Sequence, residues 1–235
     1  MKTLVFLLVA LGLAVYWFGF RPACGKSGAV ACPEPALEEG VGVTLSVREV
    51  CPGAGYLCNR KPPFQVLRWP LDKGKLRVRI ELPDFAKGRD AEQIRAAAIE
   101  GIMQWDNQPF PLVINTSRLA FRWDINVNWT QSLAVDAVGV ANAQWNFRGK
   151  RVDFSFGGMG ISVPPPEAMP QAARLAWVRS VASHEMGHAL GILWHSDRQS
   201  DTMYPSMNNA PSAPSARDLR TMEALYALPN GAMVQ

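Results

Sequence analysis

Residues 184–196 of the chain are HEMGHALGILWHS, and all three histidines of the sequence, His184, His188 and His195, lie in this stretch. On a helix, residues four apart share one face, so His184 and His188 can direct imidazole nitrogens at one point. Zinc binds such nitrogens tetrahedrally, and a catalytic zinc site uses three protein ligands and keeps one position open for water. Glu185 can reach that water without binding the metal. The stretch therefore predicts a helix that carries a catalytic zinc site.

The third ligand has to come from beyond the helix. Gly191 favours a left-handed backbone, which would end the helix and turn the following loop toward the metal. His195 lies just past that turn and is the remaining histidine. We therefore interpret His195 as the third zinc ligand. The alternatives that stay open are Asp197 as third ligand, or none.

This stretch resembles the signature of the metzincin zinc peptidases, and within them the matrixins, which is H-E-x-x-H-x-x-G-x-x-H followed by a methionine turn. Residues 184–191, HEMGHALG, are matrixin-like as they stand. Three further segments resemble the family: the His195-Ser196 pair, the Met203-Tyr204-Pro205 turn and residues 215–226, which are similar to the final matrixin helix. The resemblance covers about residues 75–228.

One position departs from the family pattern. In matrixins the third histidine comes three residues after the glycine, but here Trp194 holds that place and His195 follows it. The extra residue lies where the helix has ended, so a bulge in the loop could absorb it. The spacing from His195 to Met203 is the one expected for the family, which supports His195 as the ligand.

The resemblance implies a zinc-dependent endopeptidase that hydrolyses peptide bonds through a zinc-bound water, with Glu185 as general base and His184, His188 and His195 as metal ligands. Met203 would be a structural floor beneath the metal. The substrate would be a protein or peptide, lying antiparallel to an edge strand at about residues 138–145, with residues 205–207 forming a wall of the main specificity pocket.

Two alternative functions and the binding of calcium stay open. The first alternative is a non-catalytic, zinc-stabilised binding or scaffolding module on the same metzincin fold. The second is another class of zinc peptidase, in which Glu223 supplies the third ligand. Matrixins commonly bind calcium, but the sequence has no acidic loop with calcium-ligand spacing, so calcium is left undetermined.

The pattern of strands and helices predicts an α+β fold. The resemblance implies a metzincin catalytic domain over residues 71–235, with a twisted, mostly parallel sheet, an active-site helix and a C-terminal helix. Asp90 is expected to cap a helix whose buried face includes Ile94, Ala98 and Ile102. Alternating apolar residues predict strands at residues 76–82, 121–129 and 151–156. Further strands are expected at residues 41–47 and 138–145, and helices at residues 171–190 and 216–228.

The N-terminus predicts export. Lys2 precedes an uncharged apolar run at residues 4–20, which is typical of a signal peptide or an N-terminal membrane anchor, so residues 1–20 are assigned to either. The protein would then be secreted, periplasmic or membrane-anchored, with its catalytic domain outside the cytoplasm. The net charge of +4 is scattered along the chain, which argues against nucleic acid as a partner. Nothing predicts the oligomeric state.

Residues 21–70 form a Cys/Gly/Pro-rich extension in this interpretation. All four cysteines, Cys24, Cys32, Cys51 and Cys58, lie within it. Four cysteines in an exported chain suggest two disulfides, for which three pairings are open.

Overall fold

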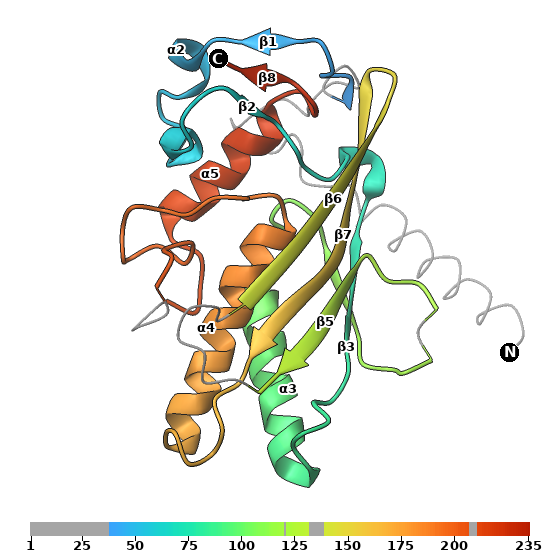
Figure 1. Cartoon of the computed structure of the whole chain (residues 1–235), viewed down its shortest axis with the longest axis vertical. Helices are drawn as coiled ribbons and strands as arrows, with labels where there is room; N and C mark the ends of the chain where they lie inside the picture. Colours follow the sequence, from blue (N-terminus) through green and yellow to red (C-terminus); the bar gives the residue numbers. More distant parts are fainter. Residues whose placement is uncertain (1–37, 120, 132–138, 207–210) are drawn as a thin grey trace, which may run out of the picture. The chain divides into compact units, whose positions relative to one another are not determined.

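The computed structural model describes residues 38–119, 121–131, 139–206 and 211–235, all of which lie in one compact unit. A five-stranded sheet in the order β4-β3-β5-β7-β6 forms its centre (Figure 1). Four of these strands run parallel, and β6 pairs antiparallel with β7 at one edge. The bounds are β3 Leu76–Ile80, β4 Leu112–Asn115, β5 Ile125–Thr130, β6 Gly139–Arg148 and β7 Arg151–Ser162. The expected α+β fold with a mostly parallel sheet is confirmed.

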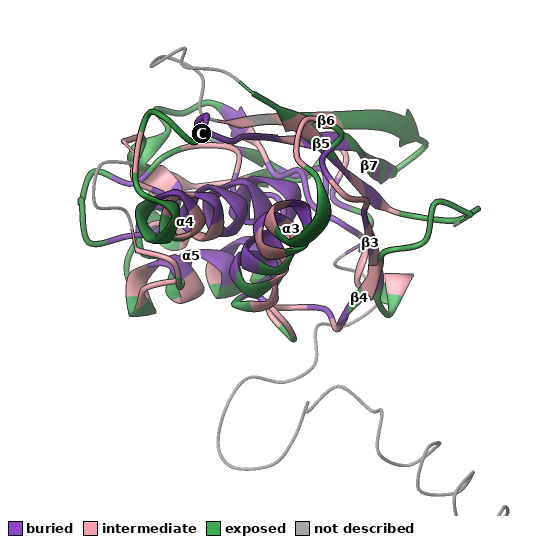
Figure 2. Ribbon diagram, turned by 90° about the horizontal axis from the view of Figure 1, so that it is seen from below, coloured by how far each residue is buried: buried purple, intermediate pink, exposed green. Residues whose placement is uncertain are grey.

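Two long helices, α3 (Gly88–Met103) and α4 (Gln171–Ala189), pack on each other and lie against one face of the sheet. Figure 2 shows that their buried sides face the strands. The helices approach closely at Gly101, where a Cβ atom would lie 2.1 Å from the carbonyl oxygen of Arg179. This packing buries the predicted apolar face of α3 and holds α4, which carries the histidine motif, beneath β6 and β7.

Two local predictions about this layer were wrong. The strand predicted at residues 121–129 begins only at Ile125, because the chain first pairs with β3 at Asp124, whose N–H and carboxylate both bind the backbone of Arg77. Phe121 before it is 91% exposed. Helix α3 begins at Gly88 without a side-chain cap, and the carboxylate of Asp90 pairs instead with Arg174 of α4.

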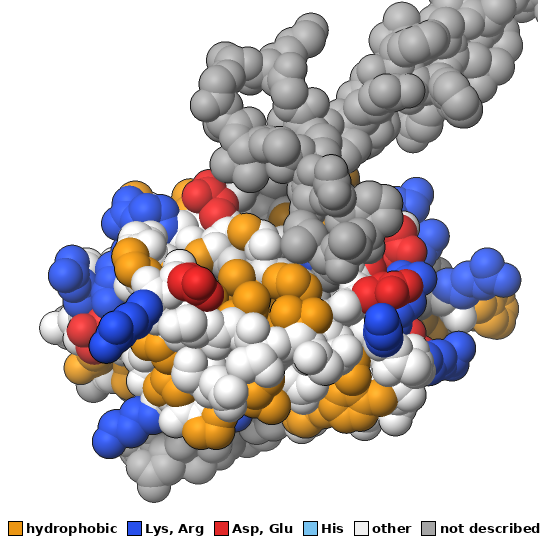
Figure 3. Space-filling model, turned by 90° about the horizontal axis from the view of Figure 1, so that it is seen from above, with side chains coloured by type: hydrophobic (Ala, Val, Ile, Leu, Met, Phe, Trp, Pro, Cys, Tyr) orange, Lys and Arg blue, Asp and Glu red, His pale blue; other side chains and the backbone are white. Residues whose placement is uncertain are grey.

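The remaining elements gather at one end of the fold. A small sheet in the order β1-β8-β2 joins residues from both ends of the described chain, and helix α5 lies near it (Figure 1). The bounds are β1 Thr44–Leu45, α2 Val47–Val50, β2 Phe64–Gln65, α5 Ala216–Ala227 and β8 Met233–Val234, with short 3₁₀ helices at Leu57–Asn59 and Leu71–Lys73. In Figure 3 apolar side chains lie in the middle of this end, and lysines and arginines lie toward its rim.

The strand predicted at residues 41–47 is too long, since β1 covers only Thr44–Leu45. Ser46 ends it, because its hydroxyl accepts the N–H of Arg48 and Glu49 completes a capping box that starts α2. The following segment packs into the main core: Phe64 and Trp69 are buried, and the Trp69 ring meets Phe154 of β7 edge-on at 5.4 Å.

Cys51 and Cys58 form a disulfide. Cys24, Cys32 and the apolar run at residues 4–20 lie outside the described residues. Within the described part of the chain, no helix is both long enough and apolar enough to cross a membrane.

Candidate metal centre

Helix α4 and the loop after it bring the three histidines together. His184 and His188 lie one turn apart on the buried C-terminal part of α4, and His195 comes from the loop. Ring centroids are 4.7 Å apart for His184 and His188, 5.2 Å for His184 and His195, and 5.0 Å for His188 and His195. One potential ligand atom from each residue lies within 4.8 Å of the others. Three imidazoles can therefore surround a single ion.

Hydrogen bonds fix the tautomer of the two helical histidines. Nδ1 of His184 lies 2.7 Å from the carbonyl oxygen of Thr202, and Nδ1 of His188 lies 2.6 Å from that of Ile192. Because a carbonyl oxygen only accepts, each Nδ1 carries the proton and each Nε2 keeps a lone pair for a metal.

Burial also keeps these side chains neutral. It lowers the pKa of His184 to about 4 and that of His188 to about 3, and it lowers the pKa of His195 as well. Neutral imidazole is the form that binds metal, so at pH 7 no proton has to be displaced from these groups.

Gly191 turns the chain as its position predicts. Helix α4 ends at Ala189, and Gly191 has φ +111°, in the left-handed region that favours glycine. The loop then delivers His195 to the other two histidines, although Trp194 is inserted before it. The indole of Trp194 points toward the segment around Tyr56, and its Nε1–H donates to the carbonyl oxygen of Tyr56 at 3.1 Å.

Met203 lies against α4, the helix that carries His184 and His188. It is fully buried, and a Cβ atom at Gly187 would come within 2.3 Å of its sulfur, so the glycine makes room for it. The turn around Met203 is held by Asp218 of α5, whose carboxylate accepts the N–H of Thr202 at 2.8 Å. The carbonyl of Thr202 is the group that orients His184.

Asp218 supports the site through contacts that no sequence motif indicates. It is fully buried, and besides Thr202 it accepts the phenol of Tyr56 at 2.6 Å. The available signal was the capping box at the start of α5, in which Ser215 and Asp218 exchange hydrogen bonds. That signal predicts the start of the helix, but it gives no indication of the contacts to Tyr56 and Thr202.

Asp197 and Glu223, the alternative third ligands, are exposed and lie outside the histidine group. The carboxylate of Asp197 binds Arg217 at 2.5 Å and the amide of Asn59 at 3.1 Å. Both hydrogen bonds lower the pKa of Asp197, and the bond from Arg217 has the larger effect. Glu223 lies on α5.

Glu185 is buried beside the histidines. It is 5% exposed, and burial raises the pKa of its carboxyl to about 8. Within the described part of the chain, its Oε2 atom has no hydrogen-bond partner. The start of β6 packs directly on it, since a Cβ atom at Gly139 would lie 2.1 Å from Oε1. An unsatisfied carboxylate oxygen is costly to bury, so it fits a site completed by another group.

The donor set selects the kind of ion that fits. Three neutral imidazoles suit zinc and related transition metals, whereas calcium takes oxygen ligands. Three ligands also leave one tetrahedral position open, next to which Glu185 follows His184 on the helix. The residues present therefore fit a zinc ion with an open coordination site.

Comparison with known proteins identifies the family. The profile of the matrixin family, peptidase M10, matches residues 110–227, half of the chain. The match runs from β4 to the end of α5 and contains the histidine triad, Glu185 and Met203. No curated protein matches the chain. The histidine triad resembles the metzincin zinc-binding site, and the chain belongs to the matrixin family of zinc metallopeptidases.

Proposed function

We propose that the chain is a zinc-dependent endopeptidase in which His184, His188 and His195 hold Zn²⁺ and Glu185 is the general base. The observation that carries the proposal is the Glu185 carboxyl, buried beside the triad with one oxygen lacking a partner among the described residues. A structural zinc site needs no base and usually closes with four ligands. The buried carboxyl therefore supports catalysis over a non-catalytic binding module.

The residues around the site support a hydrolytic mechanism. Zinc, when bound, supplies a Lewis acid for the scissile carbonyl and lowers the pKa of water in the open position. Glu185 accepts the proton of the attacking water and returns it to the leaving amine. Burial alone raises the pKa of this carboxyl to about 8, and a cation bound beside it would lower that pKa toward the ionised form that a general base needs.

An extended peptide is the substrate that suits the sheet edge. Strand β6 pairs with β7 on one side, and its other side forms an edge of the five-stranded sheet. Free backbone groups on such an edge can pair with an added strand, here antiparallel to β6. Because the first residue of β6, Gly139, lies against Glu185, a peptide on this edge would bring one of its bonds close to the Glu185 carboxyl. Residues 205–207 would wall the main specificity pocket; Met207 lies outside the described residues.

The proposed location is outside the cytoplasm, with residues 4–20 as the export signal or membrane anchor. The Cys51–Cys58 disulfide supports this, because disulfides persist in oxidising compartments.

The test measures zinc content and hydrolysis of casein by the full chain and by three variants. Glu185→Gln should retain about one zinc and lose hydrolysis, and His188→Ala should lose zinc. The matched control Glu223→Gln, which changes an exposed glutamate on α5, should resemble the wild type. Wild-type protein that binds zinc and cleaves nothing would favour the binding module, and hydrolysis by Glu185→Gln would exclude Glu185 as the base.

A further inference from the structure

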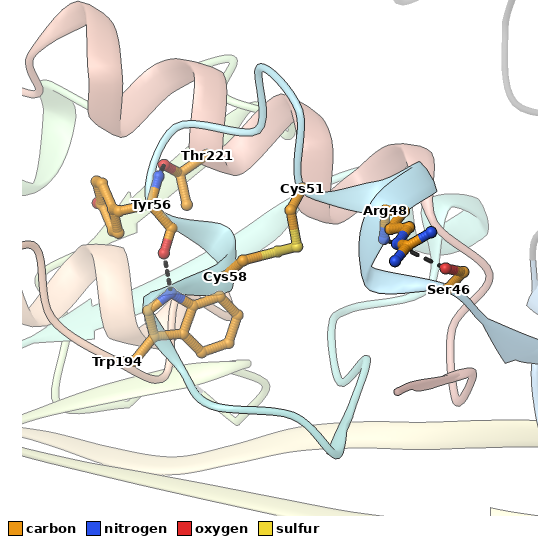
Figure 4. Close-up of a disulfide and its surroundings, with 7 residues drawn as sticks. All are labelled: Ser46, Arg48, Cys51, Tyr56, Cys58, Trp194 and Thr221. Atoms are coloured by element: carbon orange, nitrogen blue, oxygen red, sulfur yellow. Dashed lines mark hydrogen bonds between the residues drawn. A yellow bond between two sulfur atoms is a disulfide. The ribbon is translucent and has the colours of Figure 1, made fainter.

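The geometry points to Trp194 as a positioning residue, which fixes the third ligand His195 by anchoring it to the disulfide-closed segment at residues 51–59. This inference rests on the proposed role of His195 in zinc binding. It explains why the loop carries one residue more than the matrixin motif, since the added side chain has a partner of its own. Figure 4 shows the indole of Trp194 directed at this segment.

His195 needs such an anchor more than its partners do. His184 and His188 are held by the rigid helix and each has an Nδ1 hydrogen bond to a carbonyl. In the described residues no such bond is found for His195, which is exposed and comes from a loop. Its place in the triad therefore depends on the residues that flank it.

Both sides of His195 are tied to the same segment. On the N-terminal side, the indole N–H of Trp194 donates to the Tyr56 carbonyl at 3.1 Å, and its ring packs on Phe64 with centroids 6.0 Å apart. On the C-terminal side, Asp197 accepts the amide of Asn59 at 3.1 Å. These two contacts therefore hold the chain on both sides of His195.

The acceptor itself is immobilised. Tyr56 is 1% exposed, and its phenol donates to Asp218. Figure 4 shows the second bond, in which the Tyr56 N–H donates to the Thr221 hydroxyl at 3.0 Å. The Cys51–Cys58 disulfide closes a short loop around it. The loop also touches α5 so closely that a Cβ atom at Gly55 would lie 2.2 Å from the Thr221 hydroxyl. The carbonyl of Tyr56 is therefore a fixed point for the indole of Trp194.

The experiment measures the zinc dissociation constant of the full chain by competition with a chromophoric chelator. Trp194→Phe keeps the ring but removes the N–H donor. We expect zinc binding to weaken about tenfold, the lower end of the loss seen when a contact that orients a metal ligand is removed. Trp194→Phe combined with Asn59→Ala should weaken it further. The matched control is Trp129→Phe, which removes a similar bond, 3.0 Å from the indole to the carbonyl of Glu81, and leaves the contacts of residues 51–59 in place.

A spectroscopic signature separates positioning from general stability. In the cobalt-substituted protein, Trp194→Phe should change the visible absorption bands, which report ligand geometry, whereas Trp129→Phe should leave them unchanged. Equal zinc affinity and equal cobalt spectra for Trp194→Phe and wild type would overturn the inference, as would an equal loss in Trp129→Phe. If the wild type binds no zinc, or His195→Ala binds it as tightly, the proposed function fails first and this inference falls with it.

Discussion

Replacing Gly139 with alanine is expected to disable catalysis and leave the zinc site and the fold in place. Gly139 begins β6 directly against Glu185 of α4. A Cβ atom there would lie 2.1 Å from Oε1, 2.3 Å from Cδ and 2.5 Å from Cγ of Glu185. Non-bonded carbon atoms normally approach to about 3.5–4.0 Å, so one of the two groups has to move by more than about 1 Å.

Glu185 is the group that should move. Gly139 is held in register with Ile161 by the β6–β7 ladder. The end of the Glu185 side chain is flexible, and its Oε2 atom has no partner among the described residues to keep it in place. Misplacement of a reacting group by about 1 Å can cost about 10²-fold in rate, and a general base contributes about 10²–10⁴-fold. We therefore expect kcat to fall at least about 10²-fold with little change in KM.

The assay compares cleavage of a fluorogenic peptide by the full chain, Gly139→Ala and the control Gly157→Ala, with zinc content and Tm measured in parallel. Gly157 lies in the same hairpin, on β7, and a Cβ atom there would meet its nearest neighbour, the Asn142 carbonyl oxygen, at 3.6 Å, an ordinary contact. Gly157→Ala should behave as wild type. Gly139→Ala with full zinc and activity within about threefold of wild type would refute the reasoning, because the contact would then not constrain Glu185.

Three further changes test other contacts of the site. In chelator-treated protein, Glu185→Gln should raise the free energy of unfolding at pH 8 by about 4 kcal/mol and have little effect at pH 4.5. Burial raises the folded-state pKa of Glu185 from 4.5 to about 8, so its carboxyl costs stability increasingly as pH rises between these two values; urea unfolding at both pH values measures this. Gly187→Ala should lower Tm, since its Cβ would lie 2.3 Å from the Met203 sulfur and overpacking costs about 1–3 kcal/mol. Asp218→Asn should lower the free energy of unfolding, measured in urea, by about 1–3 kcal/mol, because a neutral amide replaces the charged acceptor of the Tyr56 phenol O–H. Unchanged stability of Gly187→Ala or Asp218→Asn would contradict the packing described.

The elements predicted correctly are those whose signal is local and complete. The i,i+4 histidines and Gly191 identify both the end of α4 and the face on which His184 and His188 lie together, because helix periodicity and a left-handed terminator act within a few residues. The strand at residues 121–129 was extended too far for the opposite reason. Alternation of apolar residues continues through Phe121, but a strand also needs a pairing partner, and pairing begins only at Asp124.

The support of the site depends on contacts between residues far apart in sequence, which the sequence does not indicate. Tyr56 and Asp218 are separated by 162 positions, yet their hydrogen bond joins the disulfide-closed segment to the turn that orients His184. Gly139 likewise shows no motif, and its role depends on the strand register that places it over Glu185. Such residues become visible only when the packing of the sheet on α4 is known.

The inserted Trp194 shows why the same motif tolerates a change in one place and not in another. A residue added between His184 and His188 would rotate the second ligand by about 100° around the helix and destroy the shared face. After Gly191 the chain has left the helix, so a metal site fixes only the position of the His195 ring nitrogen. The loop that leads to His195 can therefore be one residue longer. A longer loop orients the His195 ring less strictly, however, and the contacts of Trp194 and Asp197 with the segment at residues 51–59 restore that orientation. The insertion and its anchor therefore form one unit, and we expect that removing the anchor, and not the added length, is what weakens the site.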